Sequence, residues 1–168
     1  MIEHIQNYYI SERNGSAMAA ATGVVFLIIS FLLWRFSDAG SISKGIAYSL
    51  LGAGLFFTVA GIGVVIHNNT KITETKNIKA PIEAQLQQSE IERMEKVIAS
   101  SYTIPLSMFS ALLIIGLLLI LITRQEVWKG VAIGLLITGT LGHSTEAFSM
   151  KNNNVYLMKI KQINFNKK

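Results

Sequence analysis

Residues 82–123 read IEAQLQQSEIERMEKVIASSYTIPLSMFSALLIIGLLLILIT, and this stretch decides the fold. Its first half mixes charged and apolar residues at helical spacing, and its second half is almost wholly apolar. No charged residue lies between Lys96 and Arg124, so 27 successive residues carry no charge. A helix of about 20 residues already crosses the hydrocarbon core of a bilayer. The stretch therefore predicts one element that spans the membrane and continues into water.

The whole chain has the composition of a membrane protein. Of its 168 residues, 51% are hydrophobic, and its mean hydropathy is +0.43. It has no cysteine, which excludes disulfide bonds, thiolate nucleophiles and thiolate metal ligands. The formal net charge of +5 comes from basic residues that flank apolar segments. That pattern is typical of membrane surfaces, and we expect no nucleic-acid partner.

Three further apolar segments accompany this one. We expect an all-α membrane protein, a bundle of four transmembrane helices with a cytoplasmic helical extension before the third span. The spans are expected at about 16–36, 45–67, 103–123 and 127–147, within a transmembrane domain of residues 16–147. The fourth is the shortest, because only 16 uncharged residues separate Lys129 from Glu146, which is about 24 Å of helix.

The segments outside the spans are polar or amphipathic. Residues 1–15 form an amphipathic segment, either a short helix in the headgroup region or a frayed terminus. Residues 68–102 form the cytoplasmic helical insert, and Pro105 predicts a kink or short break where it meets the third span. Residues 148–168 form a basic C-terminal tail, and the fourth helix is expected to be interrupted or to end around residues 152–154.

The distribution of basic residues predicts the orientation. With four spans, both termini and the connection 68–102 lie on one side of the membrane. That side carries 11 of the 15 lysines and arginines, and the other side carries 4. Cytoplasmic loops are enriched in these residues, which places the termini in the cytoplasm. We therefore expect a multi-pass protein of the cytoplasmic (inner) membrane, and the abundance of Asn, Lys and Ile favours a bacterial source.

Small residues recur along the second and fourth spans. In the fourth span, Gly130, Gly134, Thr138, Gly142 and Glu146 follow one another at intervals of four. Small residues let helices approach closely in a bilayer, so contact between helices is the first interpretation. The wall of a pore is the alternative.

The sequence contains no catalytic motif. A P-loop, a dinucleotide-binding glycine pattern, an HExxH helix and a G-x-S-x-G elbow are all missing. The central parts of the spans also lack ionisable residues, which argues against a proton-coupled carrier. Enzyme function stays open, with a non-enzymatic role favoured, and no cofactor or catalytic residue is expected.

One group of polar residues is a candidate binding site at the inner membrane surface. Its members are His67, Arg93, Lys96, His143 and Glu146. Such a site would take an anionic headgroup, a small ligand or a metal. A metal is not expected, because carboxylate-bridged centres need two Glu-x-x-His motifs and further carboxylates. In the competing interpretation, Glu146 forms a buried structural pair with His143, Lys96 or Arg93.

These observations favour a non-enzymatic membrane protein that forms homo-oligomers through its small-residue faces and the seam Ile91/Met94/Ile98, as a pore or membrane effector. The alternatives are a membrane-embedded binding protein or small enzyme with the cytoplasm-facing site above, or an adaptor that binds a partner protein through helix 83–96. Anionic lipid headgroups at the cytoplasmic face are the expected lipid partner.

Overall fold

The computed structural model describes residues 1–76 and 83–163, and all regular structure within them is helical. The elements are α1 (Ile2–Phe36), α2 (Ile42–Lys76), α3 (Glu83–Lys96), the π-helical turn η1 (Val97–Ser101), α4 (Thr103–Ile122) and α5 (Glu126–Lys161). Long uncharged runs of good helix formers explain the length of these helices, and each run ends near a charged or turn-forming residue.

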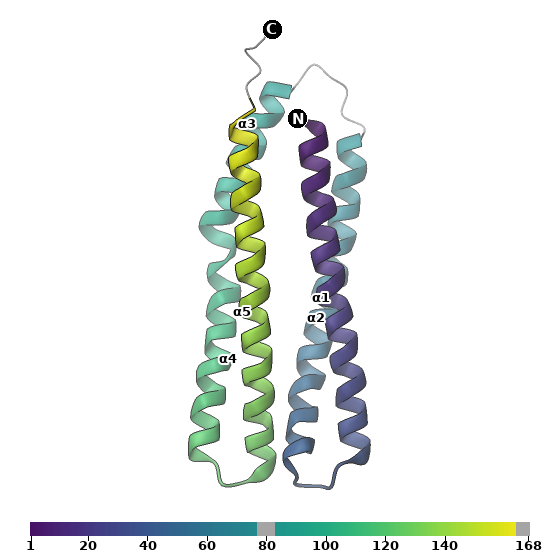
Figure 1. Cartoon of the computed structure of the whole chain (residues 1–168), viewed down its shortest axis with the longest axis vertical. Helices are drawn as coiled ribbons and strands as arrows, with labels where there is room; N and C mark the ends of the chain where they lie inside the picture. Colours follow the sequence, from purple (N-terminus) through teal and green to yellow (C-terminus); the bar gives the residue numbers. More distant parts are fainter. Residues whose placement is uncertain (77–82, 164–168) are drawn as a thin grey trace.

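The long helices form two antiparallel pairs, α1 with α2 and α4 with α5 (Figure 1). Residues 37–41 and 123–125 join the partners of each pair at one end of the molecule, which we call the turn end. The N-terminus, α3 and the last turns of α5 lie at the opposite end, which we call the terminal end. The two pairs are joined because α2 also packs against α5.

Three helices are long and apolar enough to cross a membrane: Ile2–Phe36, Ile42–Lys76 and the continuous helical stretch Gln85–Ile122. In the most apolar 18-residue segment of each helix, the buried share is only 17%, 28% and 11%, respectively. Most of this apolar surface therefore faces outward, as a lipid-facing surface does. Length and composition therefore indicate a membrane protein. α5 lies outside this set of three, because its uncharged stretch of 16 residues is short and rich in glycine and threonine.

α1 and α2 are longer than a bilayer is thick. Each has 35 residues, which is about 52 Å of helix against about 30 Å of hydrocarbon. Both helices must therefore extend well beyond the apolar layer. The extensions meet at the terminal end, where α3 and the C-terminal part of α5 join them.

Two separate apolar clusters match this division. The first lies at the terminal end and combines α1, α2, α3 and α5 through the buried residues Ile5, Tyr9, Ile72, Met94, Tyr156 and Ile160. The second lies in the apolar half and combines α1, α2 and α4 through Phe26, Leu50, Ala53, Phe57 and Phe109. The first cluster contains two tyrosines, Tyr9 and Tyr156, and it lies beside the polar residues described in the next section.

Glycines hold the helices at close range. A Cβ added at Gly45 would lie 1.9 Å from the carbonyl oxygen of Val127, and one at Gly130 would lie 1.9 Å from that of Ile42. A Cβ would come within 3.0 Å of a neighbour at six further positions: Gly23, Gly54, Gly61, Gly134, Gly139 and Gly142. Most of the small-residue faces seen in the sequence thus pack inside the chain.

The segments outside the apolar half differ in part from the sequence-based expectations. Residues 1–15 form no separate helix, because α1 runs unbroken from Ile2 to Phe36. α5 continues through residues 152–154 to Lys161, since the buried Asn153 and its neighbours pack inside the terminal end. The expected irregularity near Pro105 is present as η1, which ends where proline leaves the Ser101 carbonyl without its usual amide partner. The expected basic tail lies partly outside the described residues.

Candidate functional site

The structure separates the five sequence-predicted site residues. His67 on α2 and Lys96 on α3 are exposed. His143 faces α4, where its Nε2 lies 3.0 Å from the Ser110 hydroxyl. Arg93 on α3 and Glu146 on α5 are both half-buried. The five residues thus differ in their surroundings, and among them Arg93 and Glu146 both act on the Glu12 carboxylate.

α3 presents two different faces. The face that carries Met94, which is fully buried, packs into the terminal cluster, and Ile91 packs against the same cluster. The seam predicted from sequence is thus used within the chain at these two residues. The opposite face carries the exposed Glu92 and Lys96. That exposed face is the part of helix 83–96 that a protein partner would meet.

An ion pair links α3 to the rest of the terminal end. Arg93 donates to both carboxylate oxygens of Glu90, at 2.6 and 2.9 Å, and Glu90 is only 7% exposed. The Tyr156 hydroxyl donates to the same carboxylate at 3.0 Å. The Arg93 guanidinium also lies 5.7 Å and 5.4 Å from the ring centres of Tyr8 and Tyr9. Residues from α1, α3 and α5 therefore meet around one charge pair, which satisfies the buried carboxylate.

The pKa shifts in this cluster follow from burial and from the pair. Burial alone lowers the pKa of Arg93, but the hydrogen bond and charge of Glu90 outweigh it, so the net pKa is raised. Burial raises the pKa values of Tyr8 and Tyr156, and for Tyr156 the neighbouring Glu90 adds to the effect. Arg93, Tyr8 and Tyr156 thus keep their protons across the physiological pH range. We call the group of Tyr8, Glu90, Arg93 and Tyr156 the ion-pair cluster, and its role is structural.

A second group of polar residues surrounds Tyr102, which follows η1 and lies near the ion-pair cluster. The hydroxyl of the buried Tyr102 accepts a hydrogen bond from the Asn153 amide and lies 3.5 Å from the Ser149 hydroxyl. Glu12 of α1 and Glu146 of α5 flank it, and both carboxylates raise the pKa of Tyr102 after the larger effect of burial. Three elements therefore bring two acids and three neutral polar groups together.

Among the described residues, the two acids Glu12 and Glu146 form no ion pair. Neither carboxylate has a side-chain hydrogen bond within this part of the chain, although both residues are half-buried. Burial and then Glu146 raise the pKa of Glu12, and Arg93 partly opposes this. The Oδ1 atom of Asn153, a residue 3% exposed, also has no hydrogen-bond partner in the part of the chain that the structure describes. The carboxylates of Glu12 and Glu146 and the Oδ1 atom of Asn153 are therefore hydrogen-bond acceptors without a donor among the described residues, whereas the Glu90 carboxylate of the ion-pair cluster has its donors.

Sequence reasoning found Glu146 but missed its partner group. Glu12 and Tyr102 lie 90 residues apart in the chain, and no local pattern connects them. Glu146, Ser149 and Asn153 follow one another at intervals of three and four residues and so share a face of α5, which is a local signal in the sequence. The described residues contain no group of three or more His, Cys, Asp or Glu side chains placed to hold a metal ion.

Comparison of the chain with protein-family models, with curated proteins and with solved structures found no match. The fold indicates the class of protein: an all-helical membrane protein, with a group of polar residues toward its terminal end.

Proposed function

We propose that the chain crosses the cytoplasmic membrane four times, with both termini and α3 in the cytoplasm. Two observations support this topology. α5 runs antiparallel to α4, and it packs against both α2 and α4. Its short apolar part would therefore be in contact with two neighbouring helices inside the membrane. The turn end also carries few basic residues, as expected of a non-cytoplasmic side.

The absence of cysteine makes the topology easy to test. Each of four single variants would contain the only thiol of the chain: Ala39→Cys and Gln125→Cys at the turn end, Thr73→Cys and Lys159→Cys at the terminal end. An impermeant maleimide should label the first two in intact cells and the last two only after permeabilisation. Labelling of Lys159→Cys from outside would show that α5 does not cross.

We further propose that the chain is a non-enzymatic binding protein whose site lies between α1, η1 and α5. The observation that carries this is the pair of half-buried carboxylates, Glu12 and Glu146, which act on each other and form no ion pair among the described residues, although the charge of Arg93 also acts on Glu12. Two acids in a region of reduced dielectric repel each other unless a proton or a cationic group lies between them. The hydroxyl oxygens of Tyr102 and Ser149 and the Oδ1 atom of Asn153 add neutral oxygen ligands, which suit hard cations. The ligand class is therefore a small cation.

Thermal unfolding in detergent at constant ionic strength tests this role. The probes are sodium, potassium, magnesium and calcium chloride, each titrated separately. At least one should raise the unfolding midpoint of the wild type, because a ligand that binds only the folded state stabilises it. The shift should disappear in Glu12→Gln and Glu146→Gln and persist in the exposed control Glu92→Gln. The proposal fails if none of the four salts shifts the midpoint. Equal shifts in Glu146→Gln and the wild type would also exclude it, and unfolding of Glu146→Gln would favour a structural role.

A homo-oligomer is the second candidate function, and it rests on a different observation. Cβ atoms added at Gly52 and Gly63 would meet no described atom within 4 Å, so this side of α2 is open. A second copy of the chain could approach α2 closely there, as small residues permit in a bilayer. The mass of the detergent-solubilised protein should fall to that of a monomer in Gly52→Leu/Gly63→Leu, and should not change in Gly15→Leu, whose Cβ also meets open space. A monomeric wild type would exclude this candidate.

Anionic lipid at the terminal end is part of the same proposal. The exposed Lys151 and Lys159 lie on α5 beyond its apolar part. Basic residues at this position gain attraction from an anionic leaflet.

A further inference from the structure

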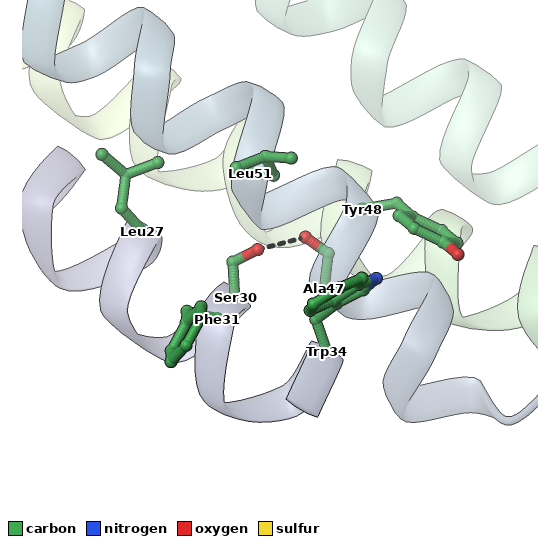
Figure 2. A pocket seen from close by; sticks show the side chains of 7 residues that line it. All are labelled: Leu27, Ser30, Phe31, Trp34, Ala47, Tyr48 and Leu51. Carbon is green, nitrogen blue, oxygen red and sulfur yellow. Dashed lines mark hydrogen bonds between the residues drawn. The ribbon is translucent and has the colours of Figure 1, made fainter. Parts of the chain in front are cut away.

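An apolar groove lies at the turn end, far from the polar residues of the terminal end. It lies between α1 and α2, and its volume is about 220 Å³. Figure 2 shows its lining, which includes Phe31 and Trp34 from α1 and Tyr48 and Leu51 from α2. These four side chains are 47% to 62% exposed, so the groove opens sideways from the helix pair. In a membrane its opening faces the hydrocarbon.

The floor of the groove is fixed by a contact between the two helices. The Ser30 hydroxyl donates to the Ala47 carbonyl oxygen at 2.7 Å, and both residues are almost fully buried (Figure 2). Because Ser30 and Ala47 are small, the flanking side chains stand above them as walls. A direct contact between the two helices therefore lies beneath the groove, and half-exposed side chains form its walls.

The end of the groove nearest to water carries a positive charge. Lys44 donates to the Trp34 carbonyl oxygen at 2.5 Å, and its ammonium lies 4.9 Å from the centre of the Trp34 ring. Trp34 and Tyr48 are amphipathic rings of the kind that concentrate at the headgroup level. Along the helix axes toward the turn end, the apolar walls are therefore followed by the aromatic rings and then by the Lys44 ammonium. The acyl chain and the headgroup of a lipid follow each other in the same order.

We propose that this groove binds one phospholipid with an anionic headgroup, with an acyl chain along α1 and α2 and the phosphate beside Lys44. Leu27 and Trp34 both line the groove, and their separation in the helix is about 10 Å, so the groove holds part of one chain. An acyl chain matches the apolar lining, and the lysine selects a negative headgroup over a zwitterionic one. This site is independent of the cation site at the terminal end.

The two tryptophans give a direct test, because Trp34 lies in the groove and Trp128 does not. The single-tryptophan variants Trp128→Phe and Trp34→Phe are reconstituted in vesicles that contain a fixed fraction of brominated phosphatidylglycerol or brominated phosphatidylcholine. Trp34 fluorescence should be quenched up to about fivefold more efficiently by the anionic lipid than by the zwitterionic one. Trp128 lines a separate groove that contains Arg124, so its quenching is compared with and without Lys44→Gln and should not change.

Two further variants assign the preference to the groove. In the Trp128→Phe background, Lys44→Gln should abolish the preference of Trp34 for the anionic lipid, with quenching normalised to each variant in unbrominated vesicles. Leu51→Phe, which narrows the groove, should reduce quenching by both lipids. The matched control Leu55→Phe lies one turn further along α2, where Leu55 is equally exposed, and should leave quenching unchanged. Equal quenching by both lipids in the Trp128→Phe protein would show ordinary boundary lipid and overturn the proposal. A preference that survives Lys44→Gln would also overturn it.

Discussion

Gly45 of α2 and Gly130 of α5 face each other across a contact that leaves no room for a side chain. A Cβ on either residue would come within 1.9 Å of a backbone carbonyl oxygen of the other helix. One turn further along, the Ser49 hydroxyl donates to the Val131 carbonyl oxygen at 3.0 Å. This contact is one of the places where the α1/α2 pair meets the α4/α5 pair, and it is the one with the least room for a side chain.

Replacement of Gly130 by alanine should therefore destabilise the protein strongly. The new methyl group meets backbone, which cannot rotate away, and overpacking of this kind costs about 1–3 kcal/mol or more. Gly52→Ala is the matched control, because its Cβ meets open space and alanine favours the helix by about 1 kcal/mol. Unfolding in detergent should show a lower midpoint for the first variant and an equal or higher one for the second. Equal midpoints for Gly130→Ala and the wild type would contradict the close contact.

Arg93→Gln should weaken the attachment of α3. The substitution leaves the buried Glu90 without its cation, and removal of one partner of a buried pair costs about 3–5 kcal/mol. Arg93 is 37% exposed in its side chain, so we expect the lower half of that range or less. Glu90→Gln/Arg93→Gln should recover part of the loss, because no unpaired charge stays behind. Lys96→Gln, which alters an exposed charge on the same helix, is the control. Protease cleavage within residues 83–96, followed by mass spectrometry, measures the detachment.

Tyr102→Phe should leave the amide of the buried Asn153 without any partner among the described residues. The expected cost is about 1–3 kcal/mol, since the amide then loses its one hydrogen bond. Tyr102→Phe/Asn153→Leu removes both polar groups and should be more stable than the single variant. A double-mutant cycle on unfolding free energies checks the coupling, and simple additivity would show that the two side chains do not interact.

The stability of the protein should depend on the protonation of Glu12. The carboxylate faces Glu146 on α5, Arg93 on α3 and Tyr102 beside η1. Burial and then Glu146 raise its pKa above the ordinary value of 4.5. A raised pKa means that folding favours the protonated form. The contribution of this group is therefore complete below about pH 4.5 and is lost as the pH rises through the folded-state pKa.

Glu12→Gln mimics the protonated form and should remove this dependence. In buffer without added cations, the variant should be more stable than the wild type at pH 7, and the two should converge near pH 4.5. Unfolding midpoints measured across this range give the test. Glu92→Gln, in which an exposed acid is changed, should follow the wild type at every pH. A wild type that is more stable than Glu12→Gln at pH 7 would show that Glu12 has a positive partner in the folded protein.

The sequence by itself determined the helical class and the apolar spans. Charge-free runs such as residues 97–123 leave no other way to satisfy the backbone in a bilayer, so a helix follows from local composition alone. It also located the irregularity near Pro105, because proline lacks an amide hydrogen wherever it stands. It indicated Glu146 as an unusual acid, since that residue closes a short uncharged stretch.

Only the tertiary structure decided which residues meet. His67 and His143 share a level in the sequence-based topology, yet one is exposed and the other faces Ser110, because helix rotation is set by packing and not by composition. The polar residues around Arg93 and Glu146 come from α1, α3 and α5 and from Tyr102 after η1, segments that lie far apart in the chain. A contact between distant helices has no signature in either helix alone, so this grouping of polar residues becomes visible only when the extended ends of α1 and α5 lie against α3.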